Sequence, residues 1–497
     1  MATKVEHLTL DERNARGVEA RTRAMPDSHA GWKPAADRPD PVALIEEQNL
    51  RRDADLIPVR HGRMVASPFT FYRGAAKIMA ADLAGTPTSG LQVQLCGDAH
   101  LSNFGVFASP ERNLVFDIND FDETLPGPFE YDVKRLAASI MVAAQNNGCS
   151  DSDARAITRA CVTSYRESMA EFAASKTLDV WYAHLAEDQI RQSVTAFLSE
   201  ANGKHKGKGS KKGKKKDPGD GMSGMTGKQV KEAQKRFAKN AQKSHSRTSD
   251  QALSKLGEQV DGRYRIASVP PVIVPARDLH TAYGVAPGEL EKVVLDLFRD
   301  YRSTLRLDLR QLLERYEIVD WARKVVGVGS VGTRAFIVLL QGRDQDDPLF
   351  LQVKEATRSV LEGTLRKSAF RQPGERVVQG QRLMQASSDI FLGWSKGVQA
   401  DRYYYWRQLR DMKGSALVEL MAPAELAFYA RTCGWTLARA HARSGDPVTI
   451  AAYLGDDDAF DKSITDFSER YAAQNDQDFA DFSKAIASNR IEAIQDV

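Results

Sequence analysis

The sequence lacks several features that would assign the protein to a class directly. No apolar run approaches the roughly 18 residues that a membrane-spanning helix needs, and the N-terminal residues lack the apolar core of a signal peptide. The four cysteines, Cys96, Cys149, Cys161 and Cys433, contain no CxxC pair, which argues against a disulfide framework and a zinc site. We find no internal repeat. We therefore expect a cytoplasmic protein in a reducing compartment, with no membrane partner.

The composition is ordinary for a globular protein, but the charge is uneven. At 497 residues, with 42% hydrophobic and 27% charged residues, the chain is long enough for two to four units or one large two-lobed domain. The net charge is +3, yet residues 201–250 alone carry +11, so the remainder is acidic. The Lys- and Gly-rich stretch 203–224 predicts a disordered loop. A weak contact of this loop with nucleic acid or anionic lipid is the alternative, and it has no interleaved aromatics to support it.

Two short apolar runs, LQVQL and NLVFDI, predict strands that each end in a polar cluster. The clusters consist of Asp98, His100, Asn103, Asp117, Asn119, Asp120, Asp122 and Glu123. Buried charge is costly unless it is paired or bound to a metal. Carboxylate and amide oxygens suit a hard cation such as Mg²⁺ and a ligand that carries phosphate. The following Pro126–Pro128 predicts a turn.

A glycine-rich motif, GVGSVG, occupies residues 327–332. Alone it is weak, because dinucleotide-binding folds and kinases both use GxGxxG. Here the residues that follow are TRAFIVLLQG, which predict a strand and not a helix. Strand–GxGxxG–strand is typical of the kinase flap, whose glycines let backbone N–H groups approach nucleotide phosphates. The alternative is a glycine-rich hairpin without a ligand.

Lys354 ends the next apolar strand, FLQVK, where kinases place the lysine that pairs with the α- and β-phosphates. A glutamate usually partners this lysine. Glu375, which opens the following predicted helix, and Glu355 and Glu362 are the candidates.

Asp98 and Asn103 have the D-x-x-x-x-N spacing of a kinase catalytic loop, in which the Asp orients the acceptor hydroxyl and the Asn holds a metal. Asp117 follows an apolar strand, as the metal-binding acid does. The alternative is that these Asp and Asn residues cap turns.

GDAHLSNF followed by VFDINDFDE resembles the HGDxHxxN…IDF pattern of aminoglycoside and other small-molecule kinases. The wider set SPFTFYRG, CGDAHLSNFG, FDINDFDET, VGVGSVGTR, FLQVKEA, RQLRDMKGS and ARAHARSGD resembles the bacterial family DUF2252, over about residues 55–475. The resemblance implies an α+β, two-lobed, protein-kinase-like fold that binds ATP and Mg²⁺.

The resemblance also implies roles for individual residues. Asp98 would be the catalytic base, and His100 would contact phosphate or brace the loop. The metal ligands would be Asn103, Asp117 and Asp120, with Asp122 as the alternative acid. The nucleotide phosphates would be held by Gly327, Gly329, Ser330, Gly332 and Lys354. Asp132 would be a structural residue of the following helix.

The order of these parts differs from that of kinases, because the catalytic and metal loops come before the glycine-rich flap. This order predicts a circular permutation. It requires Ser444, at the end of the helix containing LARAHARS, to lie near Gln92. We expect an extension at 1–55, catalytic loops and helices at 56–320, a nucleotide-binding β lobe at 321–415, and closing helices at 416–497.

The sequence therefore predicts an ATP- and Mg²⁺-dependent phosphotransferase that acts on an unknown hydroxyl acceptor, with a small molecule favoured over a protein. Two alternatives stay open: AMP transfer from the same pocket, and a nucleotide-binding regulator without activity. Before the acids lie Arg60, Arg63 and Arg73, which are either solvated or include one that faces phosphate or pairs with the acidic cluster. After the acids lie Arg407, Arg410 and Lys413, which are either solvated or salt-bridged, or contact an acidic substrate. We also expect Trp181 and Tyr182 to lie in the core.

Overall fold

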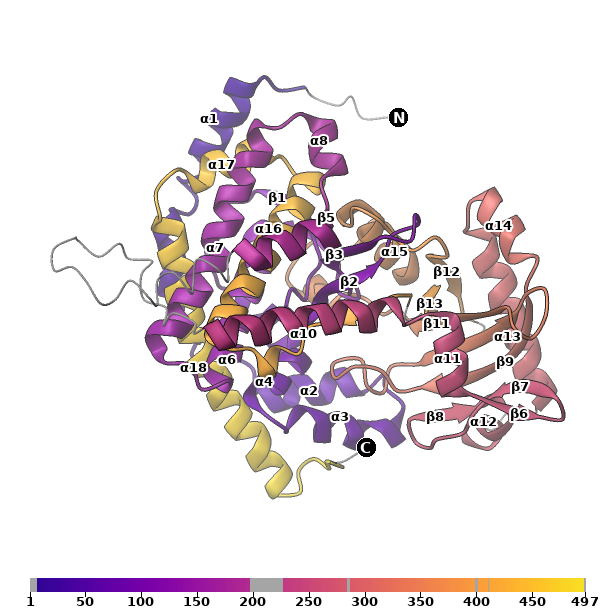
Figure 1. Cartoon of the computed structure of the whole chain (residues 1–497). Coiled ribbons are helices and arrows are strands. Elements are labelled where there is room, and N and C mark those ends of the chain that lie inside the picture. Colours follow the sequence, from indigo (N-terminus) through magenta and orange to yellow (C-terminus); the bar gives the residue numbers. More distant parts are fainter. Residues whose placement is uncertain (1–6, 197–226, 284–286, 398–400, 410, 496–497) are drawn as a thin grey trace.

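The computed structural model describes residues 7–196, 227–283, 287–397, 401–409 and 411–495. It is a mixed α+β structure in which a large sheet with its own helices lies beside a helical body (Figure 1). The predicted loop 203–224 and Arg410 lie outside the described residues. Within the described ranges, no helix has the length and apolar character needed to cross a membrane.

The largest sheet has six strands in the order β12-β13-β11-β10-β9-β8, and every neighbouring pair is antiparallel. Its strands are β8 (Ile273–Pro275), β9 (Glu317–Lys324), β10 (Ala335–Gln341), β11 (Pro348–Glu355), β12 (Gly393–Lys396) and β13 (Tyr403–Gln408). Successive side chains of a strand point to opposite faces. Thus Val338 packs with α13 (Pro287–Ser303) on one face, while Ile337 and Leu339 pack with α11 (Ser249–Leu256) on the other. Burial on both faces explains the continuous apolar run of β10.

The two predicted strands before the acids form, but they belong to different sheets. β1 (Gln92–Leu95) pairs with β4 (Leu125–Pro128), and β3 (Leu114–Ile118) pairs with β2 (Phe104–Ala108). The predicted turn at Pro126–Pro128 is therefore wrong. A strand that pairs on one side only tolerates proline, which has no N–H to donate. The sheet of β2 and β3 also contains β5 (Leu185–Ala186) and β14 (Gly414–Ser415), and β6 (Gly257–Val260) pairs with β7 (Arg263–Ile266).

The helical body is built around α16 (Pro423–Ser444), which runs along α7 (Asp151–Ala174) (Figure 1). The two helices approach closely at Gly434, where an added Cβ would lie 2.3 Å from the carbonyl oxygen of Cys161. α16 ends beside β1, since the Gln94 N–H donates to Ser444 Oγ at 3.2 Å. The proximity that the order of the motifs requires is therefore present. Also in this body are α6 (Phe129–Asn146), α17 (Pro447–Leu454) and α18 (Ala459–Ala487).

The N-terminal segment packs on this body and does not stand apart from it. Its helices are α1 (Leu10–Ala20), α2 (Pro41–Asn49), α3 (Ile57–Met64), α4 (Pro68–Gly74) and α5 (Ala76–Leu83). α1 begins with a capping box between Thr9 and Glu12, and α2 and α4 contact α18. The remaining helices are α8 (Thr177–Tyr182), α10 (Gly227–His245), α12 (Ala276–Tyr283), α14 (Leu307–Leu313) and α15 (Pro373–Met384).

The predicted core position of Trp181 and Tyr182 is wrong. They are 44% and 69% exposed, because the short helix α8 lies at the surface. The Arg443 guanidinium lies 3.8 Å from the centroid of the Trp181 ring, so this aromatic side chain is used in a cation–π contact.

Candidate functional site

The loop after β1 carries Asp98, and its path is fixed by one glycine and one buried carboxylate. Gly97 has φ = +84°, and an added Cβ there would lie 2.2 Å from the Glu123 carbonyl oxygen, so only glycine fits. The Asp132 carboxylate, on α6, accepts hydrogen bonds from the N–H groups of Cys96 at 2.7 Å and Gly97 at 3.0 Å. Asp132 therefore fixes the backbone of this loop through two hydrogen bonds, which agrees with the structural role that the resemblance implies.

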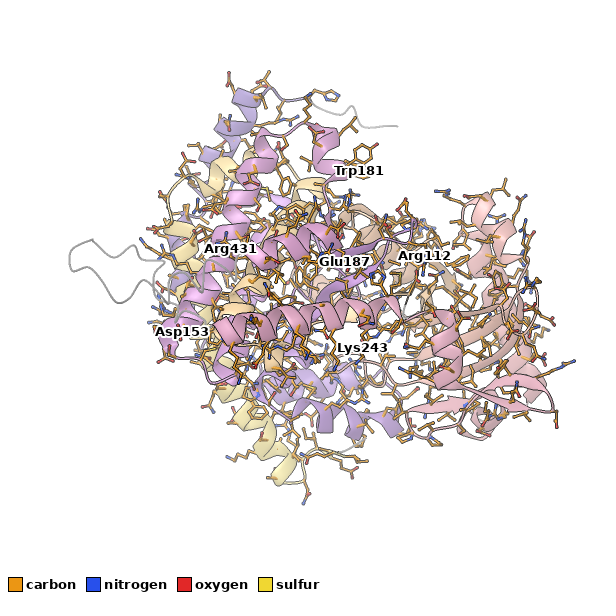
Figure 2. The ribbon with its side chains drawn as sticks, in the orientation of Figure 1. Arg112, Asp153, Trp181, Glu187, Lys243 and Arg431 are labelled. Carbon is orange, nitrogen blue, oxygen red and sulfur yellow. The ribbon has the colours of Figure 1, made fainter. Side chains whose placement is uncertain are left out.

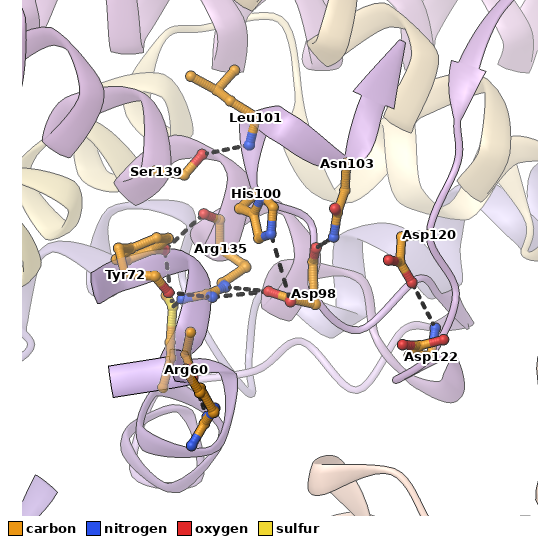
Figure 3. Close-up of polar contacts among 12 residues, drawn as sticks. Arg60, Tyr72, Asp98, His100, Leu101, Asn103, Asp120, Asp122, Arg135 and Ser139 are labelled. Carbon is orange, nitrogen blue, oxygen red and sulfur yellow. Dashed lines mark hydrogen bonds and ion pairs between the residues drawn. The ribbon is translucent and has the colours of Figure 1, made fainter. Parts of the chain in front are cut away.

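Asp98 is oriented by an arginine that the sequence analysis did not single out. Arg135, also on α6, donates from Nε to Asp98 Oδ1 at 2.9 Å and holds the same oxygen with a second nitrogen at 2.8 Å. The Arg135 guanidinium lies 3.9 Å from the Tyr72 ring centroid, which fixes its plane. Asp98 Oδ2 faces His100 Nε2 at 3.8 Å (Figure 3). One oxygen of Asp98 is thus fixed, and the other is turned toward His100.

His100 and Asn103 complete this loop. Burial lowers the pKa of His100 to about 4, so its imidazole is neutral at pH 7. Its Nδ1 is buried and has no hydrogen-bond partner among the described residues. Asn103 Nδ2 donates to the backbone oxygen of Asp98 at 2.9 Å, and this bond does not involve the amide oxygen, which is the atom that a cation would bind.

Asp117 lies in an environment of a different kind. Its side chain is 3% exposed and forms an ion pair with Arg439 of α16, which is 1% exposed. Its carboxylate also accepts from the N–H groups of Ile118 at 2.8 Å and Ala386 at 3.0 Å. Burial raises the pKa of Asp117, although Arg439 acts against this. These partners come from β3, from the residues after α15 and from α16, so the structure gives Asp117 a bracing role between these elements.

Asp120 and Asp122, in the loop between β3 and β4, meet Lys354 of β11. The Lys354 ammonium lies 3.6 Å from Asp120 Oδ2 and also contacts Asp122 Oδ2. The Tyr405 hydroxyl donates to Asp122 Oδ1 at 2.8 Å, from the position directly opposite Lys354 in the sheet. Figure 3 shows the two carboxylates side by side. The site therefore joins residues more than 200 positions apart in sequence.

The charges in this cluster stabilise one another. Burial would raise the pKa of Asp120, but the positive charges of Lys354 and Arg407 offset this and hold it at about 2. The same carboxylates raise the pKa of Lys354 against the opposing effect of burial. The glutamates that the sequence offered for Lys354 are not its ion-pair partners among the described residues. Glu355 pairs with Arg402.

The predicted strand–glycine–strand arrangement is present, with residues 327–332 connecting β9 to β10. Gly327 and Gly332 have φ of +66° and +85°, in the region that favours glycine. An added Cβ on Gly329 would lie 3.1 Å from the backbone oxygen of Arg73. Ser330, in the middle of the loop, accepts at its backbone oxygen from the Thr333 hydroxyl at 2.7 Å. The backbone of this loop thus favours glycine at residues 327 and 332, and Gly329 lies close to a neighbouring backbone.

The N-terminal segment holds this glycine-rich loop in place. Arg63 of α3 donates to the Gly327 oxygen at 2.7 Å, and the Asp53 N–H donates to the Gly332 oxygen at 2.8 Å. Arg52 donates to the Val331 oxygen. Arg73 links the loop to Asp98, because its backbone oxygen borders Gly329 and its charge interacts with the Asp98 carboxylate. Arg60, by contrast, is fully buried and donates to Asn49, Gln48 and the Gly74 oxygen.

The donor set around Lys354 suits a hard cation. The carboxylates of Asp120 and Asp122 already pair with one positive group. The Asn103 backbone oxygen accepts from the Asn119 N–H at 2.9 Å, which joins the Asp98 loop to the loop of these acids. In the described parts of the chain, no three His, Cys, Asp or Glu side chains are gathered closely enough to form a complete metal site. A cation held by these two carboxylates would need further oxygens from water or from its own ligand, as is usual for Mg²⁺.

Comparison with known proteins places the chain in a family without giving it a relative of established activity. The family model described as "Uncharacterized protein conserved in bacteria (DUF2252)" matches residues 52–220 and 208–485. No curated protein and no solved structure matches the chain. The two matched segments include the Asp98 loop, the acids after β3, the glycine-rich loop and Lys354, and the chain therefore belongs to the DUF2252 family.

Proposed function

We propose that the protein is an ATP- and Mg²⁺-dependent phosphotransferase with a hydroxyl acceptor, and that its site lies between the glycine-rich loop, Lys354 and the Asp98 loop. One observation carries the proposal. The Lys354 ammonium, one hairpin after the glycine-rich loop, meets Asp120 and Asp122 from a distant segment. Phosphoryl transfer needs positive groups that contact the phosphates, and it needs carboxylates that hold the metal close to them.

Each residue then has a role that follows from its contacts. Lys354 and the loop 327–332 would bind the nucleotide phosphates, and Asp120 and Asp122 would hold Mg²⁺ together with Asn103. Bound Mg²⁺ supplies charge neutralisation for the transferred group. Asp98 Oδ1 is held by Arg135, which leaves Oδ2 to accept the proton of the acceptor hydroxyl. We assign the metal to Asp120 and Asp122 in preference to Asp117, because Asp117 is paired with Arg439.

We also propose a protein-kinase-like fold whose segments are circularly permuted. Three observations support it: the antiparallel sheet with Lys354 on β11, the helix α15 that packs on β12 and β13, and the end of α16 next to β1. In this arrangement α16 takes the place of the helix that leads into a kinase catalytic loop. The chain does not run from α16 directly into the Asp98 loop, because the permutation places that loop after β1, early in the sequence.

The test uses purified protein with Mg²⁺ and ATP labelled either at the α- or at the γ-phosphate, incubated with fractionated metabolite pools. We expect transfer of the γ label, lost in Asp98→Asn and Asp120→Asn and retained in the surface control Glu111→Gln. Far-UV circular dichroism checks that each variant is folded. Transfer of the α label would establish AMP transfer instead. If neither label is transferred and Mg·ATP causes no thermal shift, phosphoryl transfer and AMP transfer are both refuted.

A further inference from the structure

A concave site lies beside the β2–β3 sheet, and none of the residues assigned above to phosphate, metal or catalysis lines it. It is a cavity of about 450 Å³ between β2, β3, α16 and α10. Much of its wall is apolar, contributed by Val106, Leu114, Phe116, Ile190, Met421 and Phe428. A cavity of this volume with mostly apolar walls is typical of a small-molecule site.

The rim of this cavity is basic. The helix α10 and the residues after it place Arg236, Lys239, Lys243 and Arg247 along one side. The two acids that also line the cavity are already paired, because Glu425 binds Arg236 at 2.7 Å and Glu187 binds His245 at 2.7 Å. Glu187 and Lys243, both labelled in Figure 2, line this cavity.

A smaller cavity of about 320 Å³ continues from the first and shares Lys243, Arg247 and Ser415 with it. Its other lining residues are Gln251, Lys255 and Lys413, so within the described chain it has basic walls and no acidic one. Burial and the nearby Arg407 lower the pKa of Lys413 to about 7, against the opposite effect of Asp120. Arg407 and Lys354 repel the Lys413 ammonium while Asp120 and Asp122 attract it, and a bound anion would offset the repulsion.

The two cavities are thus complementary to a molecule with two unlike ends. An apolar body gains free energy in the larger cavity through removal from water, and a charged head meets Lys243 and Lys413 in the smaller one. A polar nucleotide does not match the larger cavity, and a neutral lipid does not use the basic walls.

We propose that these joined cavities bind an amphipathic anion, with its apolar chain between β2, β3 and α16 and its anionic head at Lys243 and Lys413. None of the residues assigned above to phosphate, metal or catalysis lines these cavities, although the Lys413 charge acts on Asp120, and the proposal does not depend on phosphotransfer. Its occupant would come from the classes of acyl or alkyl carboxylates and phosphates.

Isothermal titration of the full-length protein with dodecyl phosphate, below its micelle concentration, tests this. We expect saturable one-to-one binding. Decyl phosphate should bind about 15-fold more weakly, since each buried methylene contributes about fourfold. Dodecanol and inorganic phosphate should each bind at least about tenfold more weakly, because each lacks one of the two ends. Mg·ATP should not displace dodecyl phosphate.

Matched variants locate the binding. Lys243→Met should weaken dodecyl phosphate binding about tenfold, whereas Lys231→Met, on an exposed part of the same helix outside the cavity lining, should not change it. Thr432→Trp and Ala416→Trp should each fill the cavity and abolish binding, with circular dichroism as the check on folding. The proposal is overturned by any of three results: equal affinity for dodecanol and dodecyl phosphate, equal effects of the two lysine variants, or full binding in a folded tryptophan variant. Competition by Mg·ATP would instead make the cavity the nucleotide site, and would also overturn it.

Discussion

Replacing Arg439 by methionine should destabilise the protein strongly, because it leaves the Asp117 carboxylate buried without its cation. The two side chains are 1% and 3% exposed. Removing one partner of a buried ion pair costs about 3–5 kcal/mol. Asp117 keeps its hydrogen bonds from the N–H groups of Ile118 and Ala386, so we expect a loss near the lower end of this range. The Met384 oxygen also loses its 2.6 Å donor, for about 1 kcal/mol more.

Urea unfolding followed by circular dichroism at pH 7 measures this loss. The double variant Asp117→Leu, Arg439→Met removes both charges and should recover most of the free energy of unfolding, to within about 1–2 kcal/mol of wild type. Arg490→Met is the matched control, since its pair with Asp40 is 43–45% exposed and should contribute at most about 1 kcal/mol.

The pH dependence has a defined sign. In Arg439→Met the folded-state pKa of Asp117 rises further above its unfolded value, so the folded state binds an extra proton as the pH falls. The deficit relative to wild type should therefore shrink between pH 7 and pH 5. A loss below about 1 kcal/mol, or a double variant less stable than the single one, would refute a bracing role for Asp117.

Three further predictions concern the surroundings of the site. Gly332→Ala should lower the free energy of unfolding in urea by about 1–2 kcal/mol, because φ is +85° and the added Cβ would lie 3.0 Å from Arg52. The control Gly363→Ala, which has open space around it, should be nearly neutral. Burial raises the pKa of Glu123 to about 7, so wild-type stability should fall as the pH rises from about 4.5 to 7, and Glu123→Gln should remove this fall and be the more stable protein at pH 8. The pKa of His100 is about 4, so the transfer activity should show no step from this group between pH 5 and 8, and His100→Asn should keep the shape of that profile.

The local parts of the site were predictable from the sequence. The β-branched runs on both sides of residues 327–332 predict strands, and the structure has β9 and β10 there. Lys354 lies near the end of β11, as expected from FLQVK. The apolar runs before the acids form β1 and β3. These features depend on neighbours within about ten residues, where periodicity and propensity carry information.

The pairings across the chain were not predictable. Nothing in the local sequence distinguishes Asp117 from Asp120, since both follow the same apolar run. The difference depends on Arg439, 322 positions later, and on Lys354, which the fold brings to Asp120 and Asp122. In the structure Asp117 lies inside β3 and Asp120 lies beyond its end, and the uninterrupted burial of β3 leaves no alternation that could have shown this.

The first 55 residues were expected to form an extension, and this division of the chain remains a prediction. Their contacts nevertheless include the glycine-rich loop, through Arg52 and Asp53. An arginine surrounded by polar residues has no pattern that reveals a partner about 280 positions away. Truncations of the N-terminus should accordingly be judged by their effect on that loop.

The most direct test of the central claim is calorimetric titration of Mg·ATP into the wild-type protein and into Lys354→Met, with Lys396→Met on β12 as the control lysine. The account predicts Mg²⁺-dependent binding by the wild type, a loss of about tenfold or more in Lys354→Met, and no change in Lys396→Met. Wild-type protein that does not bind Mg·ATP, or a folded Lys354→Met that binds it as tightly as wild type, would contradict the account.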